Sequence, residues 1–120
     1  VKMGIENAVV GKKVFDISNS IQDYVDSEGF SIVRELVGHG IGRQLHRTPQ
    51  IPNFSNPATM DLNVELKEGM CLAIEPMVNM GTRHIKTDSD GWTIRTKDGN
   101  ASAHFEHSIL ITKFQPRILT

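Results

Sequence analysis

The sequence predicts an α+β fold in which a helix packs on a mostly antiparallel sheet. Apolar residues at helical spacing occur near the start of the chain, whereas short segments bounded by turn signals fill its second half. The 120 residues are enough for one domain of ordinary size. We therefore expect a single domain over residues 1–120.

The helix is expected over residues 16–28. Asp16 or Ser18 can cap its start, and Gly29 can end it in the left-handed conformation. The apolar residues that recur at helical spacing are Ile17, Ile21, Tyr24 and Val25.

The rest of the chain is expected to be strands and turns. Residues 31–36 form a plausible short strand, whereas residues 48–61 contain three prolines and no periodicity, which predicts a long loop. Two dipeptides typical of hairpins precede or separate strands expected at 92–96 and 104–111, and these are Asp90-Gly91 and Asp98-Gly99.

Composition excludes several classes of protein. The near-neutral net charge of −1 argues against a general nucleic-acid surface, which needs clustered Lys and Arg. No apolar run approaches the roughly 20 residues that cross a membrane. The single cysteine, Cys71, cannot form an internal disulfide, which favours a reducing cytoplasmic location.

Two glutamates stand on strands that otherwise resemble core strands. Alternation places Glu75 on the same side as the small residues Cys71 and Ala73, and it places Glu106 beside His104. A buried carboxylate needs a partner. The alternatives are an edge glutamate that reaches solvent and a hydrogen-bonded polar cluster without a metal.

A glycine-rich segment supplies a third candidate group. Glycines flank His39 in Gly38-His39-Gly40, where they would let backbone or ligand approach closely. A structural role for His39, and a surface position for His46, are the alternatives. We expect Glu75 and Glu106 to converge from neighbouring interior strands with His39 close by, in a set that suits Mn, Fe, Co or Zn.

Three motifs carry a resemblance to a known family. In chain order, Gly38-His39-Gly40-Ile41-Gly42, Ile74-Glu75-Pro76-Met77 and Phe105-Glu106-His107 resemble the C-terminal signatures of methionine aminopeptidases. The segments 66–70 and 91–93 also fit, and the likeness covers nearly the whole chain. The type I branch fits better, because no large insertion interrupts these residues.

The resemblance implies the pita-bread fold, in which two pseudo-symmetric α/β halves surround a dinuclear metal site. Residues 1–120 would be the C-terminal half of a single catalytic aminopeptidase domain, and the N-terminal half would lie outside them. That half carries two aspartate ligands and a further histidine in the family. Their absence here agrees with a charge deficit, because two divalent ions carry +4 and two glutamates supply −2.

The resemblance also assigns roles. His39, Glu75 and Glu106 would bind two divalent metal ions (Co, Mn, Fe or Zn), with Glu106 bridging both, and Glu75 would be the general acid/base. His46 would bind the scissile amide and stabilise the tetrahedral intermediate.

The remaining assignments concern the substrate. Trp92 would form part of the wall near the substrate entrance, and His104, which stands where the family usually has glutamine, would also contact the substrate. Leu36 and Leu45 occupy positions that are aromatic in some members, so the methionine pocket is expected to differ in shape.

The implied activity is removal of the initiator methionine from nascent proteins in the cytoplasm. The implied partners are nascent polypeptides with N-terminal methionine, the ribosome and the missing N-terminal half. Two alternatives stay open: a proline-specific aminopeptidase or dipeptidase of the same fold, and a non-catalytic pita-bread binding module. The Gly-His-Gly-Ile-Gly run favours the methionine enzyme, and retention of His39, Glu75 and Glu106 argues against lost chemistry.

Overall fold

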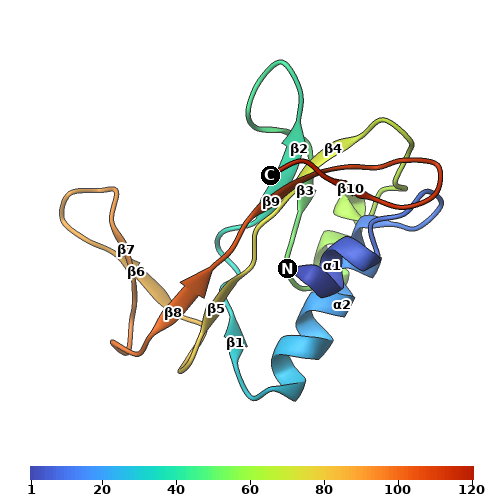
Figure 1. Cartoon of the computed structure of the whole chain (residues 1–120). Coiled ribbons are helices and arrows are strands. Elements are labelled where there is room, and N and C mark those ends of the chain that lie inside the picture. Colours follow the sequence, from blue (N-terminus) through green and yellow to red (C-terminus); the bar gives the residue numbers. More distant parts are fainter.

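The computed structural model describes residues 1–120 and shows the α+β architecture that the sequence predicts (Figure 1). The helices are α1 (Lys2–Glu6), α2 (Val14–Ser27) and the 3₁₀ helix η1 (Pro57–Leu62). The strands are β1 (Ser31–Ile32), β2 (Gly38–Ile41), β3 (Arg47–Ile51), β4 (Cys71–Ile74), β5 (Met77–Asn79), β6 (Ile85–Thr87), β7 (Ile94–Thr96), β8 (Ser102–His104), β9 (His107–Leu110) and β10 (Arg117–Ile118). No helix has the length and apolar character needed to cross a membrane.

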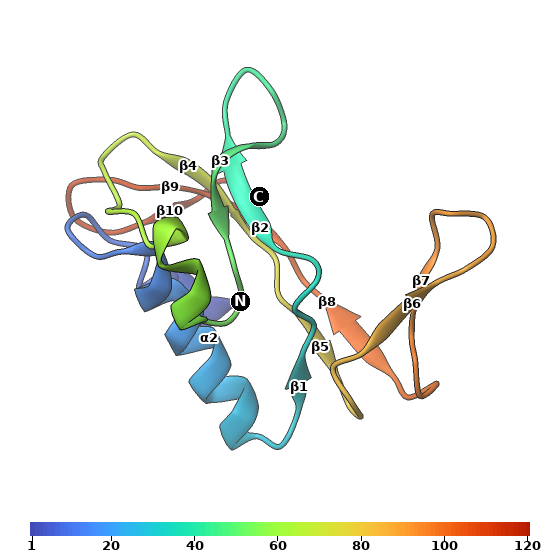
Figure 2. The same ribbon diagram turned by 180° about the vertical axis from the view of Figure 1, so that it is seen from behind.

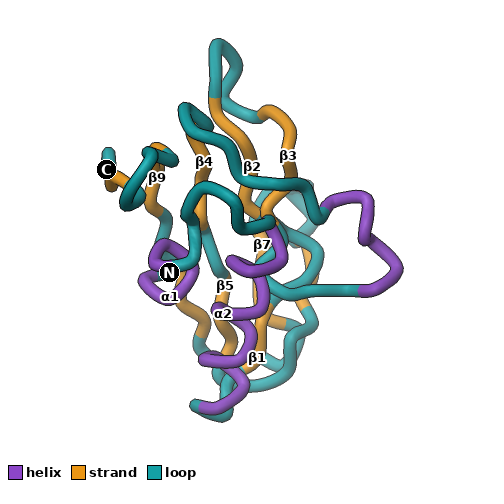
Figure 3. The backbone as a smooth tube through the Cα atoms, turned by 90° about the vertical axis from the view of Figure 1, so that its right-hand side faces the viewer, coloured by secondary structure: helices purple, strands orange, loops and turns teal.

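The strands form three antiparallel sheets. The largest has the order β10-β9-β4-β2-β3, a second has the order β1-β5-β8, and β6 pairs with β7 alone. Strands β4, β2 and β3 run side by side in Figure 3. Both β4 and β9 have a neighbour on each side, which confirms that the strands next to the two glutamates are interior to the sheet.

The first two sheets are joined by one continuous register. Ile74 lies opposite His107 where β4 pairs with β9, and Met77 lies opposite His104 where β5 pairs with β8. Both strands are interrupted at the same level, and proline at position 76 cannot donate a ladder hydrogen bond. The strand expected over residues 104–111 is therefore split into β8 and β9.

The hydrophobic core lies between the helices and one face of the five-stranded sheet, and Figure 2 shows the helices on this side. Its buried residues from α2, β4 and β9 include Ile17, Ile21, Val25, Leu72, Ile74 and Ile109. Burial of a whole Leu or Ile side chain stabilises a fold by about 1.5–3 kcal/mol. The opposite face of the sheet carries His39, Ala73 and Ser108, which lie next to one another in register.

Helix α2 begins two residues earlier than the sequence predicts, at Val14. The cap residue is Lys13, and Asp16 lies within the first turn of the helix. The Asp16 carboxylate accepts a hydrogen bond from the Lys13 N–H at 2.7 Å. Ser18 is buried and donates to the Pro52 carbonyl at 2.6 Å. Neither residue is the cap, although Asp16 still satisfies a free N–H at the start of the helix.

The end of α2 is as predicted. Gly29 has a φ of 77°, in the left-handed region that ends many helices. Ile17, Ile21 and Val25 are buried, but Tyr24 is exposed. The apolar stripe of the helix is therefore narrower than the sequence pattern indicates.

The prediction of a loop over residues 48–61 is wrong, because most of the segment belongs to β3 and η1. Strand β3 is at the edge of its sheet, and Pro49 lies where its pairing with β2 is irregular, between Arg47 and Gln50. Edge strands and bulges are where strands tolerate proline. Pro57 lies at the start of η1, where its missing N–H costs nothing. The prolines are compatible with regular structure at these particular positions.

The strand predicted over residues 31–36 is shorter than expected. Only Ser31 and Ile32 pair with β5. After Val33 the chain leaves the sheet, and the Arg34 N–H bonds to the carboxylate of the adjacent Glu35 at 3.1 Å.

The Asp90-Gly91 turn joins β6 and β7 in a hairpin, as predicted, and this hairpin projects away from the helices (Figures 1 and 2). The Asp90 carboxylate accepts hydrogen bonds from the N–H groups of Trp92 and Thr93 at 2.9 Å each, so the strand starts only at Ile94. The hairpin predicted at Asp98-Gly99 is wrong, since β8 pairs with β5 rather than with β7.

Candidate metal centre

The sheet register brings the three predicted ligands to one point. His39 lies opposite Ala73, and Glu75 is two residues further along, so their side chains share a face. Continuing the pairing of Ile74 with His107 places Glu106 opposite Glu75. One ligand atom from each of His39, Glu75 and Glu106 lies within 4.8 Å of the others. The predicted convergence is confirmed, while binding of metal by these residues stays a prediction.

Two glycines determine how closely His39 approaches its neighbours. A Cβ on Gly38 would collide with the Ala73 carbonyl oxygen, and a Cβ on Gly40 would collide with the Thr48 carbonyl oxygen. Glycine is therefore needed on both sides of His39 so that β2 can pack between β3 and β4. The predicted close approach is confirmed for the backbone.

The hydrogen bonding of His39 leaves a lone pair directed at Glu75. Its Nδ1 lies 2.9 Å from the Gly40 carbonyl oxygen, which can only accept, so Nδ1 carries the proton. A neutral ring then has an unprotonated Nε2, and this atom lies 3.4 Å from Oε1 of Glu75. Two acceptor atoms that face each other repel unless a cation lies near both. The donor set thus fits a divalent ion that takes imidazole and carboxylate ligands.

The electrostatic environment of Glu75 also favours a bound cation. Its side chain is 14% exposed, and this burial raises the pKa of its carboxyl group above the ordinary value. The nearby Glu106 carboxylate raises that pKa further, whereas His39 and His104 oppose the shift. A cation between two carboxylates held this close would offset the repulsion between their negative charges.

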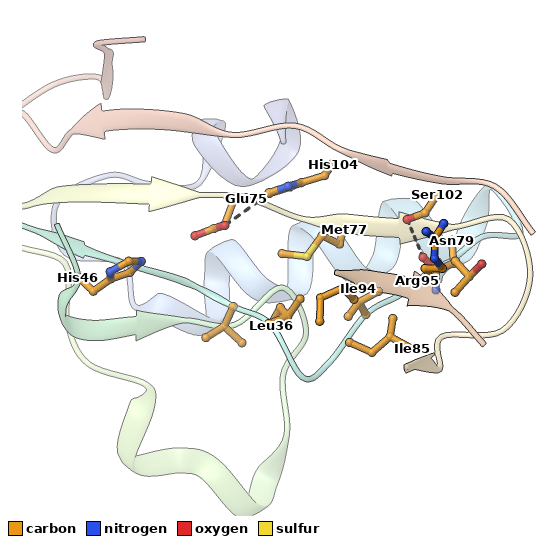
Figure 4. Close-up of a pocket in the computed structure, with 13 residues that line it drawn as sticks. Leu36, His46, Glu75, Met77, Asn79, Ile85, Ile94, Arg95, Ser102 and His104 are labelled. Atoms are coloured by element: carbon orange, nitrogen blue, oxygen red, sulfur yellow. Dashed lines mark hydrogen bonds and ion pairs between the residues drawn. The ribbon is translucent and has the colours of Figure 1, made fainter. Parts of the chain in front are cut away.

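A cavity of about 550 Å³ opens beside Glu75 (Figure 4). His46 and His104 line it together with Glu75, and apolar side chains including Leu36 and Met77 form much of the remaining wall. The rings of His46 and His39 are 4.2 Å apart between centroids. Both substrate-binding histidines predicted from the sequence therefore lie at the cavity.

Trp92 is not brought to this cavity. It lies in the β6–β7 turn and is 87% exposed, and Leu45 is exposed as well. Instead, Ile85, Ile94 and Arg95 of the same hairpin line the cavity. The hairpin signal in the sequence locates the turn but gives no indication of which surface the strands face.

The fold and the site together define an α+β domain whose sheet presents a His-Glu-Glu group that could hold a metal ion. The chain belongs to metallopeptidase family M24, whose sequence profile matches residues 1–113.

The chain is similar to methionine aminopeptidases. It is 53% identical to the methionine aminopeptidase of Clostridium perfringens and 51% identical to methionine aminopeptidase 1 of Bacillus subtilis, each over 117 residues. These matches cover 98% of this chain and 46% of each relative. The chain therefore spans about half the length of the curated relatives it matches.

Solved structures agree with this placement. The methionine aminopeptidase of Thermotoga maritima superposes with a TM-score of 0.92 at 48% identity, over 99% of this chain and 47% of that one. The prolidase of Pyrococcus furiosus gives a TM-score of 0.66 at 22% identity, which is a likeness of fold alone. The pita-bread fold expected from the motifs is thus confirmed.

Proposed function

We propose that these residues are the C-terminal half of a methionine aminopeptidase catalytic domain, which removes the initiator methionine from nascent proteins by hydrolysis. The observation that carries this proposal is the convergence of His39, Glu75 and Glu106 on one sheet face. The high identity to methionine aminopeptidases supports the methionine enzyme over the proline-specific one, for which the likeness is only one of fold.

The residues have distinct tasks in this proposal. His39 offers Nε2 as a ligand because the Gly40 carbonyl holds the proton on Nδ1. Glu106 reaches the same point from the opposite strand. Glu75 binds beside them and accepts or returns a proton, and its partly buried carboxyl group, with a raised pKa, suits proton transfer near neutral pH.

The cofactor is proposed to be two divalent ions, of Co, Mn, Fe or Zn. When bound, they would supply Lewis acidity that activates water and polarises the substrate carbonyl. Glu75 and Glu106 supply −2 against +4, so further carboxylates are needed. The resemblance locates two aspartate ligands in the other half of the family's domain, which the relatives' extra length can contain.

The cavity beside Glu75 is proposed to receive the substrate. His46 would donate to the scissile amide and to the developing oxyanion, because it lines the cavity without belonging to the ligand cluster. Apolar residues such as Leu36 and Met77 suit an apolar side chain of methionine. Three further parts of the proposal rest on the resemblance. They are a position of Trp92 near the substrate entrance, nascent chains and the ribosome as partners, and a cytoplasmic location.

A chimera tests this function. The 117 matched residues of Bacillus subtilis methionine aminopeptidase 1 are replaced by those of this chain, so that the ligands from both halves are present. With Co(II) or Mn(II), the purified chimera should release methionine from a Met-Ala-Ser peptide.

Two comparisons make the test specific. His39→Ala in the chimera should abolish turnover and reduce bound metal, whereas a peptide with proline in second position and a residue other than methionine first should not be cleaved. A folded chimera that binds metal but cleaves only the proline peptide would overturn the proposal in favour of a proline-specific enzyme. A folded chimera that binds no metal would favour a binding module.

A further inference from the structure

The Glu75 carboxylate is held between two imidazoles. Oε1 lies 3.4 Å from Nε2 of His39. Oε2 lies 3.4 Å from Nε2 of His104, and this contact is drawn in Figure 4. No other side chain forms an ion pair with the Glu75 carboxylate. His104 is therefore placed to donate a hydrogen bond to Oε2.

The position of His104 follows from the sheet register. His104 lies opposite Met77 on β5, and Glu75 is two residues before Met77 on the same face. A diagonal cross-strand pair of this kind is within reach for two long side chains.

We propose that His104 is a positioning residue, whose Nε2–H holds Oε2 of Glu75 and leaves Oε1 free beside His39 for the metal. The inference rests on the proposed metal centre and assigns His104 a role other than substrate contact. Groups that orient a metal ligand in this way commonly change metal affinity by roughly 10–100-fold when they are removed. Glutamine also offers an N–H donor, so His104→Gln is the conservative variant.

The two histidines predict opposite tautomers. His39 carries its proton on Nδ1, because that atom faces the Gly40 carbonyl, whereas His104 carries its proton on Nε2. Long-range ¹H–¹⁵N NMR spectra of the uniformly ¹⁵N-labelled chain distinguish these states at about pH 8, where an ordinary imidazole is neutral. The exposed His84, outside the cavity, gives an internal reference.

Variants at Glu75 test the contact. Glu75→Ala should return His104 to the mixed tautomers of a free imidazole, while His39 keeps its Nδ1 proton. Glu75→Gln retains an acceptor and should preserve the Nε2–H form of His104. A Nδ1–H form of His104 in the unaltered chain, or no change in folded Glu75→Ala, would overturn the inference.

A metal titration separates the inference from the proposed function. Co(II) should bind the unaltered chain, and His104→Leu should raise the dissociation constant roughly 10–100-fold, with His104→Gln close to the unaltered chain. Equal affinity in all three would overturn the positioning role. If His39 instead carries its proton on Nε2 while His104 behaves as expected, the result would contradict the proposed metal centre but not the positioning role of His104.

Discussion

At the scale of single residues, His46 differs in position from the proposed metal ligands, although its ring centroid is 4.2 Å from that of His39. It lines the cavity with Glu75 but does not belong to the cluster whose ligand atoms converge. A residue placed in this way can act on the substrate without holding the metal.

His46→Ala in the chimera should therefore lower kcat with little loss of bound metal. Loss of one donor to an oxyanion costs roughly 10²–10³ in rate. Steady-state kinetics with the Met-Ala-Ser peptide, together with metal content, measure both effects. His84→Ala is the matched control, since His84 does not line the cavity. An unchanged kcat, or loss of metal, would remove His46 from this role.

Sequence reasoning identifies the faces of single strands but not how the strands pair. Alternation correctly predicts that His104 and Glu106 share a side, as the register of β8 and β9 requires. The predicted proximity of Glu106 to Glu75 is confirmed, but the register that produces it joins segments about 30 residues apart, and local pattern does not encode that register. The contact between His104 and Glu75 depends on the same pairing and was not predicted.

At the scale of elements, the main error in the predicted fold came from the prolines of residues 48–61. Residues 48–61 lack periodicity, yet Pro49 lies in β3 at a sheet edge and Pro57 begins η1. Whether a strand is at an edge is a property of the whole sheet. Helix α2 was predicted more accurately, because its buried residues repeat within a single local segment.

The connection between β7 and β8 depends on one carboxylate. Asp98 accepts hydrogen bonds from the N–H groups of Thr82 (2.7 Å) and Asn100 (3.0 Å), which lower its pKa from 3.8 to about 2. Because the pKa is depressed in the folded state, this contact stabilises the folded chain above about pH 4. The contribution is lost as the pH falls from about 4 toward 2.

We therefore expect the NMR chemical shift of the Thr82 amide proton to follow the titration of Asp98, with a midpoint at a pH of about 2. Asp98→Ala should abolish this transition and shift the Thr82 resonance already at neutral pH. Asp90→Ala, which affects the β6–β7 turn, is the matched control and should leave Thr82 unchanged. A midpoint at or above 3.8 would contradict the structural account.

At the scale of the whole molecule, the site supplies too little negative charge for two ions. Glu75 and Glu106 neutralise half of +4, and an imidazole that binds a metal through Nε2 adds no negative charge. Large apolar side chains, including Phe105, Phe114 and Leu119, are also exposed. Exposed apolar surface and free strand edges favour association with another chain.

Residues 1–120 alone should therefore bind at most one ion per chain and fail to release methionine from a Met-Ala peptide. Equilibrium dialysis with Co(II) or Mn(II) measures the bound metal, and the chimera serves as the active control under the same conditions. Sedimentation should show self-association, because the apolar residues above have no partner within the chain. Two ions per monomer, with turnover close to that of the chimera, would mean that these residues contain all the necessary ligands and that the carboxylates expected from another half are not required.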